Sequence, residues 1–133
     1  MANFLYNKDM IVFDDVISIC DHDKRKTMNK SGVYCLFHQI DSKKKKCLYI
    51  GASENICNRI QRFSNTNRMA KESIYLRAVV KAIPSSQLFV GISFFAIEQL
   101  AIKEHEFIKK MNPMLNCNFT VWRPYGFQYG RAN

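Results

Sequence analysis

The sequence of 133 residues lacks the features that mark several common protein classes. Its five cysteines include no pair with CxxC spacing, its three histidines show no zinc-finger spacing, and no signal-peptide pattern stands at the N-terminus. We therefore expect no structural zinc site, and we expect reduced thiols in a cytoplasmic protein. The longest apolar run, Leu88 to Ile97, is too short to cross a bilayer, so no membrane partner is expected.

Acidic residues are also scarce, and their distribution is uneven. The chain has 20 lysines and arginines against 11 aspartates and glutamates, a formal net charge of +9. Residues 1–23 hold five acids and one base, a balance of −4, so the rest of the chain carries +13. A body this basic suggests a polyanionic partner, although solubility alone would explain the charge equally well. A hydrophobic content of 47% indicates one folded domain.

Two short runs rich in β-branched and aromatic residues predict a β-hairpin. They are Val33 to Ile40 and Cys47 to Ile50, and the polar segment Asp41 to Lys46 separates them. Each run carries a tyrosine two residues from a glycine, in Gly32-Val33-Tyr34 and in Tyr49-Ile50-Gly51. Pairing of the runs would bring the two phenols close together.

A helix is predicted after the hairpin, with Ser53 as its N-cap and Ile56, Ile60 and Phe63 as its buried stripe. Arg59 stands eight residues after Gly51, at the edge of that stripe. An arginine at such an edge often only covers apolar surface with its stem. Beside two tyrosines, its guanidinium would suit the binding of a phosphate.

A later helix, Ile97 to Met111, places one carboxylate on its apolar side. The stripe of Ile97, Leu100, Ala101, Phe107, Ile108 and Met111 is centred on Glu104, and the other charged residues are expected on the far side. A buried carboxylate is costly unless it is paired, protonated or bound to a metal. Glu104 is therefore either the partner of a buried cation such as Arg59 or a metal ligand.

These residues in this order resemble the motifs of the GIY-YIG nuclease family, whose first motif tolerates Val for Ile. The resemblance covers residues 32–116 and rests on Gly32-Val33-Tyr34, Tyr49-Ile50-Gly51, Arg59, Glu104 with Pro113, and Asn116. We expect an α+β fold, with a small antiparallel sheet of three strands starting near Val33, Cys47 and Leu88 and with flanking helices. Gly32 and Gly51 would be structural positions of the motif.

The resemblance implies a divalent-metal-dependent DNA endonuclease that leaves 5′-phosphate and 3′-hydroxyl ends. Glu104 would hold one Mg²⁺ or Mn²⁺, Arg59 would stabilise the transition state, and Asn116 would orient phosphate or water. Tyr34 would take the proton of the attacking water, with Tyr49 positioning the water or sharing that task. An ordinary phenol has a pKa near 10, so the positive charges of Arg59 and the metal would have to make its proton easier to lose. Which phenol is the base stays open, because Phe63, Leu48 and Ala52 stand where relatives carry other residues.

The sequence departs from the family pattern at three positions. Phe63 stands where many members have histidine or tyrosine, and Leu48 and Ala52 flank the second motif where some members have lysine. The alternative is therefore a nucleic-acid-binding module of the same fold with little or no catalysis. A homodimer, or a partner that supplies specificity, also stays open, as do phage, mobile-element (homing endonuclease), restriction and repair roles.

The two terminal segments and several basic residues outside the motifs are expected to cover the sheet or to contact DNA. We expect residues 1–30 to form an extension packed on the body, with a helix from Asp14 or Asp15 to about Cys20. Residues 117–133 form an aromatic and basic tail, either folded over the sheet or stacked on bases. The residues expected to bind the nucleic-acid backbone are Arg62, Arg68, Lys71, Arg77 and Lys81.

Overall fold

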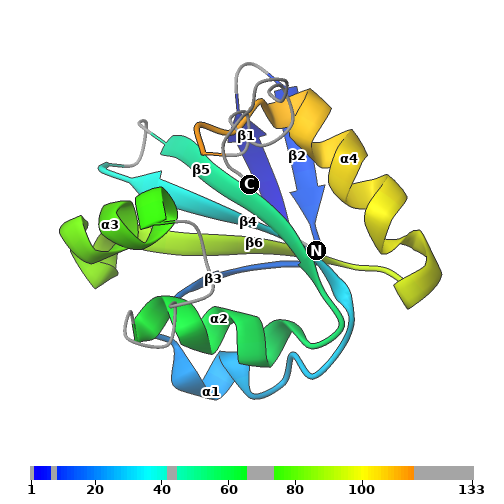
Figure 1. Ribbon diagram of the computed structural model, residues 1–133, viewed down its shortest axis with the longest axis horizontal. Coiled ribbons are helices and arrows are strands. Elements are labelled where there is room, and N and C mark those ends of the chain that lie inside the picture. Colours follow the sequence, from blue (N-terminus) through cyan, green and yellow to red (C-terminus); the bar gives the residue numbers. More distant parts are fainter. Residues whose placement is uncertain (1, 7–8, 42–44, 66–73, 116–133) are drawn as a thin grey trace.

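The computed structural model describes residues 2–6, 9–41, 45–65 and 74–115, and it shows an α+β fold (Figure 1). The strands are β1 Ala2–Tyr6, β2 Asp9–Phe13, β3 Asp15–Ser18, β4 Gly32–Gln39, β5 Lys45–Ser53 and β6 Leu88–Phe94. The α-helices are α1 His22–Arg25, α2 Ile56–Ser64, α3 Ile74–Ala82 and α4 Leu100–Met111. Two short 3₁₀ helices, η2 Ser85–Gln87 and η3 Ile97–Gln99, precede β6 and α4.

The central sheet has four antiparallel strands in the order β3-β6-β4-β5, and β1 pairs with β2 in a separate two-stranded sheet. The three predicted strands are confirmed as β4, β5 and β6. The structure adds β3 as a fourth strand at one edge, and β5 forms the other edge, between α2 and α4 in Figure 1.

Strand β4 lies inside the sheet and contributes side chains to two hydrophobic cores, one on each face. Alternate residues of a strand point to opposite faces. Tyr34 and Leu36 belong to the core that includes residues of α2 and α3. Val33, Cys35 and Phe37 belong to the core on the opposite face, which includes residues of α4. With both faces covered, residues 32–37 are all buried.

A β-bulge in the hairpin sets the direction of Tyr49. Leu36 pairs with Tyr49 and Phe37 pairs with Cys47, so Leu48 is an extra residue in β5. Cys47 belongs to the α4-side core, whereas both Leu48 and Tyr49 pack on the α2 side. Strict alternation from Cys47 would have turned Tyr49 toward α4, so the bulge brings Tyr49 to the same face as Tyr34.

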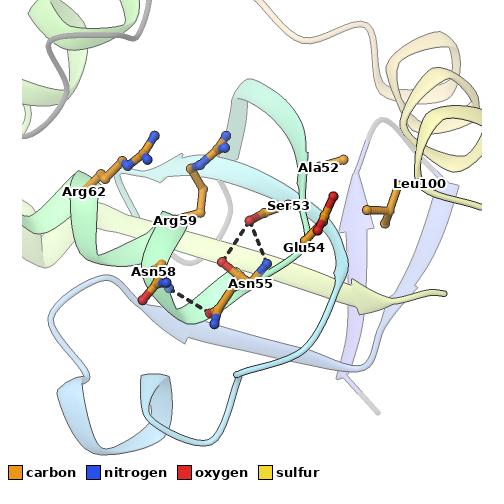
Figure 2. A pocket seen from close by; sticks show the side chains of 8 residues that line it. All are labelled: Ala52, Ser53, Glu54, Asn55, Asn58, Arg59, Arg62 and Leu100. Atoms are coloured by element: carbon orange, nitrogen blue, oxygen red, sulfur yellow. Dashed lines mark hydrogen bonds between the residues drawn. The ribbon is translucent and has the colours of Figure 1, made fainter. Parts of the chain in front are cut away.

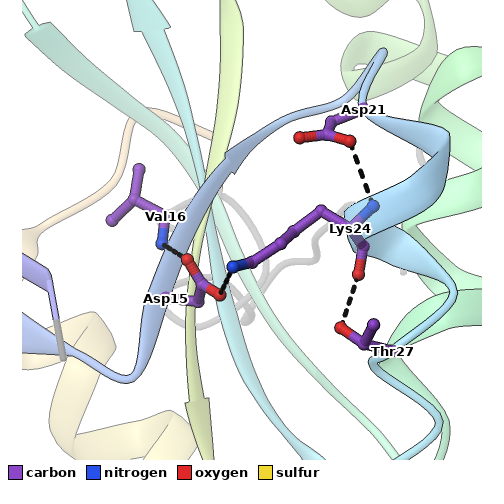
Figure 3. Close-up of polar contacts among 5 residues, drawn as sticks. All are labelled: Asp15, Val16, Asp21, Lys24 and Thr27. Carbon is purple, nitrogen blue, oxygen red and sulfur yellow. Dashed lines mark hydrogen bonds and ion pairs between the residues drawn. The ribbon is translucent and has the colours of Figure 1, made fainter.

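The predicted helix near residues 14–20 is wrong, since this segment forms β3. The backbone amide of Asp14 donates to Ile92 O at 2.8 Å, and Asp14 Oδ2 accepts from the amide of Phe94 at 2.7 Å, so this aspartate joins the chain to β6. Asp15 pairs with Lys24 of α1 at 3.2 Å, as Figure 3 shows. The cap of a helix here is Asp21, whose Oδ1 accepts from the amide of Lys24.

Two predicted helix starts also differ from the structure. The N-cap of α2 is Asn55, whose Oδ1 accepts from the amide of Asn58 at 3.1 Å, and not Ser53. Ser53 Oγ instead bonds both the amide and the carbonyl of Asn55 and so shapes the turn before the helix. The predicted helix Ile97–Met111 begins as η3 and becomes α-helical only at Leu100.

Two cysteine thiols, those of Cys35 and Cys47, are buried in the core. Cys20, Cys35, Cys47 and Cys57 are free, and Cys117 lies outside the described residues. Burial raises the pKa of Cys35, and it raises the pKa of Cys47 to about 12, so both thiols stay protonated and unreactive at neutral pH. In the described part of the chain, no helix combines the length and the apolar character needed to cross a membrane.

Candidate active site

The candidate site begins with Tyr34, which lies on the α2 side of the sheet. Tyr34 pairs across the hairpin with Gly51, and its side chain is fully buried. A Cβ atom added at Gly51 would stand 2.6 Å from Cζ and 2.9 Å from Cε1 of Tyr34. The phenol therefore occupies the space that a side chain at Gly51 would fill, which explains why the second motif ends in glycine.

Two further aromatic rings enclose Tyr34. The Tyr49 ring lies 6.3 Å away between centroids, and the Phe63 ring of α2 packs edge-on at 5.7 Å. Phe63 is buried, whereas Tyr49 is only partly buried. Phe63 thus gives Tyr34 an apolar neighbour at the position where a histidine or tyrosine was expected from the family pattern.

Arg59 joins α2 to this aromatic group. Its Nη1 donates a hydrogen bond to the Tyr34 hydroxyl at 3.2 Å, and its Cζ lies 5.9 Å from the centroid of the same ring. Because Tyr34 accepts this bond, its own proton is not committed to Arg59. The structure thus brings Tyr34, Tyr49 and Arg59 together.

Glu104 approaches from α4, on the opposite face of the sheet. It is partly buried, and burial raises its pKa above the ordinary value of 4.5. The backbone amide of Ala52 and the positive charge of Arg59 act in the opposite direction and lower that pKa. The Glu104 carboxyl group therefore stands near the end of edge strand β5, within the electrostatic field of Arg59.

The apolar stripe of α4 differs in part from the predicted one. Leu100 and Met111 are buried and Phe107 and Ile108 pack on the α4-side core, but Ile97 is 54% exposed and Ala101 is exposed as well. The 3₁₀ turn before Leu100 shifts the first residues out of phase with the helix. Lys103, expected on the far side, is partly buried, and its Nζ lies 5.5 Å from the centroid of the Phe95 ring.

A pocket of about 480 Å³ opens beside these groups, where β5 leads into α2. Its lining, shown in Figure 2, consists of Ala52, Ser53, Glu54, Asn55, Asn58, Arg59, Arg62 and Leu100. Leu100 stands one helical turn before Glu104 on α4, so the pocket lies between Arg59 and the segment that carries Glu104. Of its polar lining residues, only Arg59 and Arg62 were expected from the sequence to have a functional role.

The residues that sequence reasoning missed are those between the second motif and Arg59. Ser53, Glu54, Asn55 and Asn58 line the pocket because the chain must turn from β5 into α2 within these positions. The fixed spacing from Gly51 to Arg59 was the available signal, since every polar side chain in so short a connection stays close to the arginine.

The remaining predicted residues lie apart or outside the described residues. Arg77 and Lys81 are on α3 and do not line the pocket. Arg68, Lys71 and Asn116 lie outside the described residues. Leu115, which directly precedes Asn116, is buried in the same core as Tyr34, and its amide donates to Leu48 O at 2.9 Å.

The raised pKa of Glu104 predicts a pH-dependent effect on stability. The folded protein holds this proton more tightly than the unfolded chain, so the stabilisation is complete below about pH 4.5 and is lost as the pH rises through the folded-state pKa. Glu104→Gln keeps the neutral form at every pH. We expect its Tm in metal-free buffer to exceed that of the parent at pH 8 and to equal it near pH 4. An equal difference at both pH values would contradict this prediction.

The contact between Gly51 and Tyr34 predicts a destabilising substitution. Gly51→Ala would push its Cβ into a ring already enclosed by Tyr49 and Phe63, and overpacking of this kind costs about 1–3 kcal/mol. Urea denaturation measures the loss. The control is the same substitution combined with Tyr34→Leu, which removes the colliding atoms and should reduce the cost. Equal costs in both backgrounds would show that the ring is not the obstacle.

Comparisons with known proteins give structural neighbours only. Neither a scan of protein-family models nor a search of curated proteins found a match. Among solved structures, the GIY-YIG N-terminal endonuclease domain of UvrC from Thermotoga maritima, bound to magnesium as its catalytic divalent cation, is similar. The two chains are 18% identical with a TM-score of 0.48, over 71% of this chain and 97% of that one.

Two point mutants of the same UvrC domain, each with a tyrosine changed to phenylalanine, give similar values. One is 18% and the other 16% identical, both with a TM-score of 0.46 over 72% of this chain and 96% of theirs. The structural neighbours of the chain are thus GIY-YIG endonuclease domains. The strand order and register described above define the fold of this chain.

Proposed function

We propose that this protein is a divalent-metal-dependent DNA endonuclease that leaves 5′-phosphate and 3′-hydroxyl ends. The observation that supports the proposal is the convergence of Tyr34, Tyr49 and Arg59 beside a carboxylate, Glu104, whose pKa responds to the charge of Arg59. The basic body of the chain supports DNA as the partner.

A single carboxylate, that of Glu104, suits a metal ion that binds few protein ligands. Within the described ranges, no group of three or more His, Cys, Asp or Glu side chains could enclose a metal ion. Mg²⁺ is commonly held by one or two carboxylates and keeps water and phosphate oxygens as its other ligands, and Mn²⁺ suits the same oxygen donors. We propose that Glu104 holds one such ion, which would supply positive charge at the scissile phosphate and the leaving 3′ oxygen.

The other catalytic roles would fall to Arg59 and the two tyrosines. Arg59 would stabilise the charge that develops on the phosphoryl oxygens, and its bond to Tyr34 fixes its position. Because Tyr34 is fully buried and Tyr49 is only partly buried, Tyr49 is better placed to meet the attacking water, with Tyr34 as its buried neighbour. Asn116, which lies outside the described residues, would orient phosphate or water.

The cellular location, the number of strands cut and the biological role are also part of this proposal. The free thiols of the described residues agree with a reducing compartment, and we propose a cytoplasmic location. One active site cuts one strand, so double-strand cleavage would require a homodimer, a partner protein or two successive events. A homing, restriction or repair role would follow from the DNA that the protein prefers.

A plasmid-nicking assay tests the proposal. Supercoiled DNA incubated with the protein and millimolar Mg²⁺ or Mn²⁺ should become nicked or linear, and chelation by EDTA should stop the reaction. Sequencing and end-labelling of the products should give 5′-phosphates. DNA binding without metal-dependent cuts would contradict the proposal and would favour the binding module, for which the apolar contact of Phe63 with Tyr34 is the supporting observation.

A further inference from the structure

We propose that the pocket between β5 and α2 reads the nucleotide next to the scissile phosphate, with Glu54 as its specificity-determining residue and Asn58 as a contact to the adjoining phosphate. This inference rests on the proposed function, because it assigns a substrate contact to the same site. The pocket has a volume of about 480 Å³, is open to solvent and is lined mainly by polar side chains, so it offers hydrogen-bonding groups to one nucleotide of a bound strand.

The hydrogen bonds around the pocket separate structural from uncommitted side chains. Ser53 and Asn55 are engaged with each other and with the start of α2, as the dashed lines of Figure 2 show. Arg59 is engaged with Tyr34. Glu54 and Asn58 are exposed, and within the part of the chain that the structure describes neither side chain makes a hydrogen bond or an ion pair.

The two uncommitted side chains stand at different ends of the pocket. Figure 2 shows Glu54 on the side of Leu100 and Ala52, and Asn58 on the side of Arg59 and Arg62. The guanidinium groups of Arg59 and Arg62 therefore lie at one end of the pocket. The carboxylate of Glu54 and the apolar side chain of Leu100 lie at the other end. A nucleotide has the matching arrangement, with an anionic phosphate at one end and a flat base with polar edges at the other.

This arrangement selects among bases. A carboxylate accepts hydrogen bonds and donates none, so Glu54 would favour a base with an exocyclic amino group. Cytosine, adenine and guanine carry such a group and thymine does not. The Leu100 side chain offers an apolar surface to the face of the base, while the amide of Asn58 and the guanidinium of Arg62 would hold the adjoining phosphate.

Cleavage rates test the inference directly. The position next to the cut is varied among four otherwise identical duplexes, and the parent is expected to cut the duplex with cytosine there about tenfold faster than the one with thymine, equal to about 1.4 kcal/mol. Glu54→Gln, whose amide both donates and accepts, should lose most of this difference while still cutting. Glu98→Gln is the matched control, because it removes an equal charge at an exposed residue that does not line the pocket.

Nucleotide binding without metal separates this inference from the proposed function. Deoxycytidine monophosphate should shift the NMR signals of backbone amides between residues 53 and 62, N3-methylthymidine monophosphate, whose base has no N–H donor, should shift them less, and Glu54→Gln should remove the difference. Binding with this preference in a chain that does not cut DNA would leave the subsite standing and refute the nuclease. Cleavage that ignores the neighbouring base, with no such amide shifts, would refute the subsite and leave the nuclease standing.

Discussion

Glu104→Gln is expected to reduce metal-dependent DNA cleavage by on the order of 10³-fold, the upper range for removing one electrostatic stabiliser of a transition state. Glu104 is the partly buried carboxylate of α4 whose pKa is raised by burial and lowered by the amide of Ala52 and the charge of Arg59. Glutamine keeps the size of the side chain but neutralises it, so it holds Mg²⁺ far less well. Initial nicking rates over a range of Mg²⁺ concentrations would measure the loss.

A matched control stands two residues along the same helix. Glu106 is exposed, and among the described residues its one ion-pair partner is Lys103, so Glu106→Gln makes the same chemical change away from the site. We expect it to cut like the parent. In addition, Mg²⁺ should raise the Tm of the parent and of Glu106→Gln but not that of Glu104→Gln, because a ligand stabilises only the folded state that binds it. Parental cleavage by Glu104→Gln would show that this carboxylate is not the metal ligand.

The central hairpin and the helix that follows it were predictable because their patterns are local. Apolar runs on both sides of a polar segment gave β4 and β5, and the spacing of Ile56, Ile60 and Phe63 gave the buried face of α2. Arg59 was placed correctly at the edge of this face, since it is partly buried and still reaches Tyr34.

The N-terminal segment was not predictable because its structure is decided by a distant partner. Val16 and Ile17 are β-branched and favour a strand, but the acidic residues before them suggested a helix cap. The choice is made by β6, which pairs with residues 15–18 across more than 70 positions of sequence and receives Asp14 as a hydrogen-bond acceptor. Local propensity is a weak guide where tertiary pairing decides the outcome.

The sequence indicated which residue types to consider for the site, but not which face of the sheet each residue occupies. The sequence identified Glu104 through its position on an apolar helix, yet the structure places that helix across the sheet from Tyr34 and Arg59. The charge of Arg59 nevertheless acts on Glu104, and the amide of Ala52, near the end of edge strand β5, acts on it as well. The β-bulge at Leu48 is equally hidden from the sequence, although it decides that Tyr49 faces Tyr34.

Arg59→Ala is expected to reduce the cleavage rate by about 10²–10³-fold, with a smaller effect on DNA affinity. The guanidinium is held by the Tyr34 hydroxyl, so it is already oriented before the substrate arrives. Arg59→Lys should recover little of the rate, because an ammonium group lacks the planar fork that contacts two phosphate oxygens together. Single-turnover rates and DNA affinity, measured separately, distinguish a loss of catalysis from a loss of binding.

The hydrogen bond between Arg59 and Tyr34 adds a second test of the same assignment. If Tyr34 acts by orienting Arg59, then Tyr34→Phe should lower the rate in the parent and have little further effect in Arg59→Ala, so the two losses would not add. Arg62→Ala, three residues along the pocket wall, should weaken DNA affinity more than the rate. Additive losses would show that Tyr34 acts on water or substrate without Arg59, and parental cleavage by Arg59→Ala would refute the proposed site.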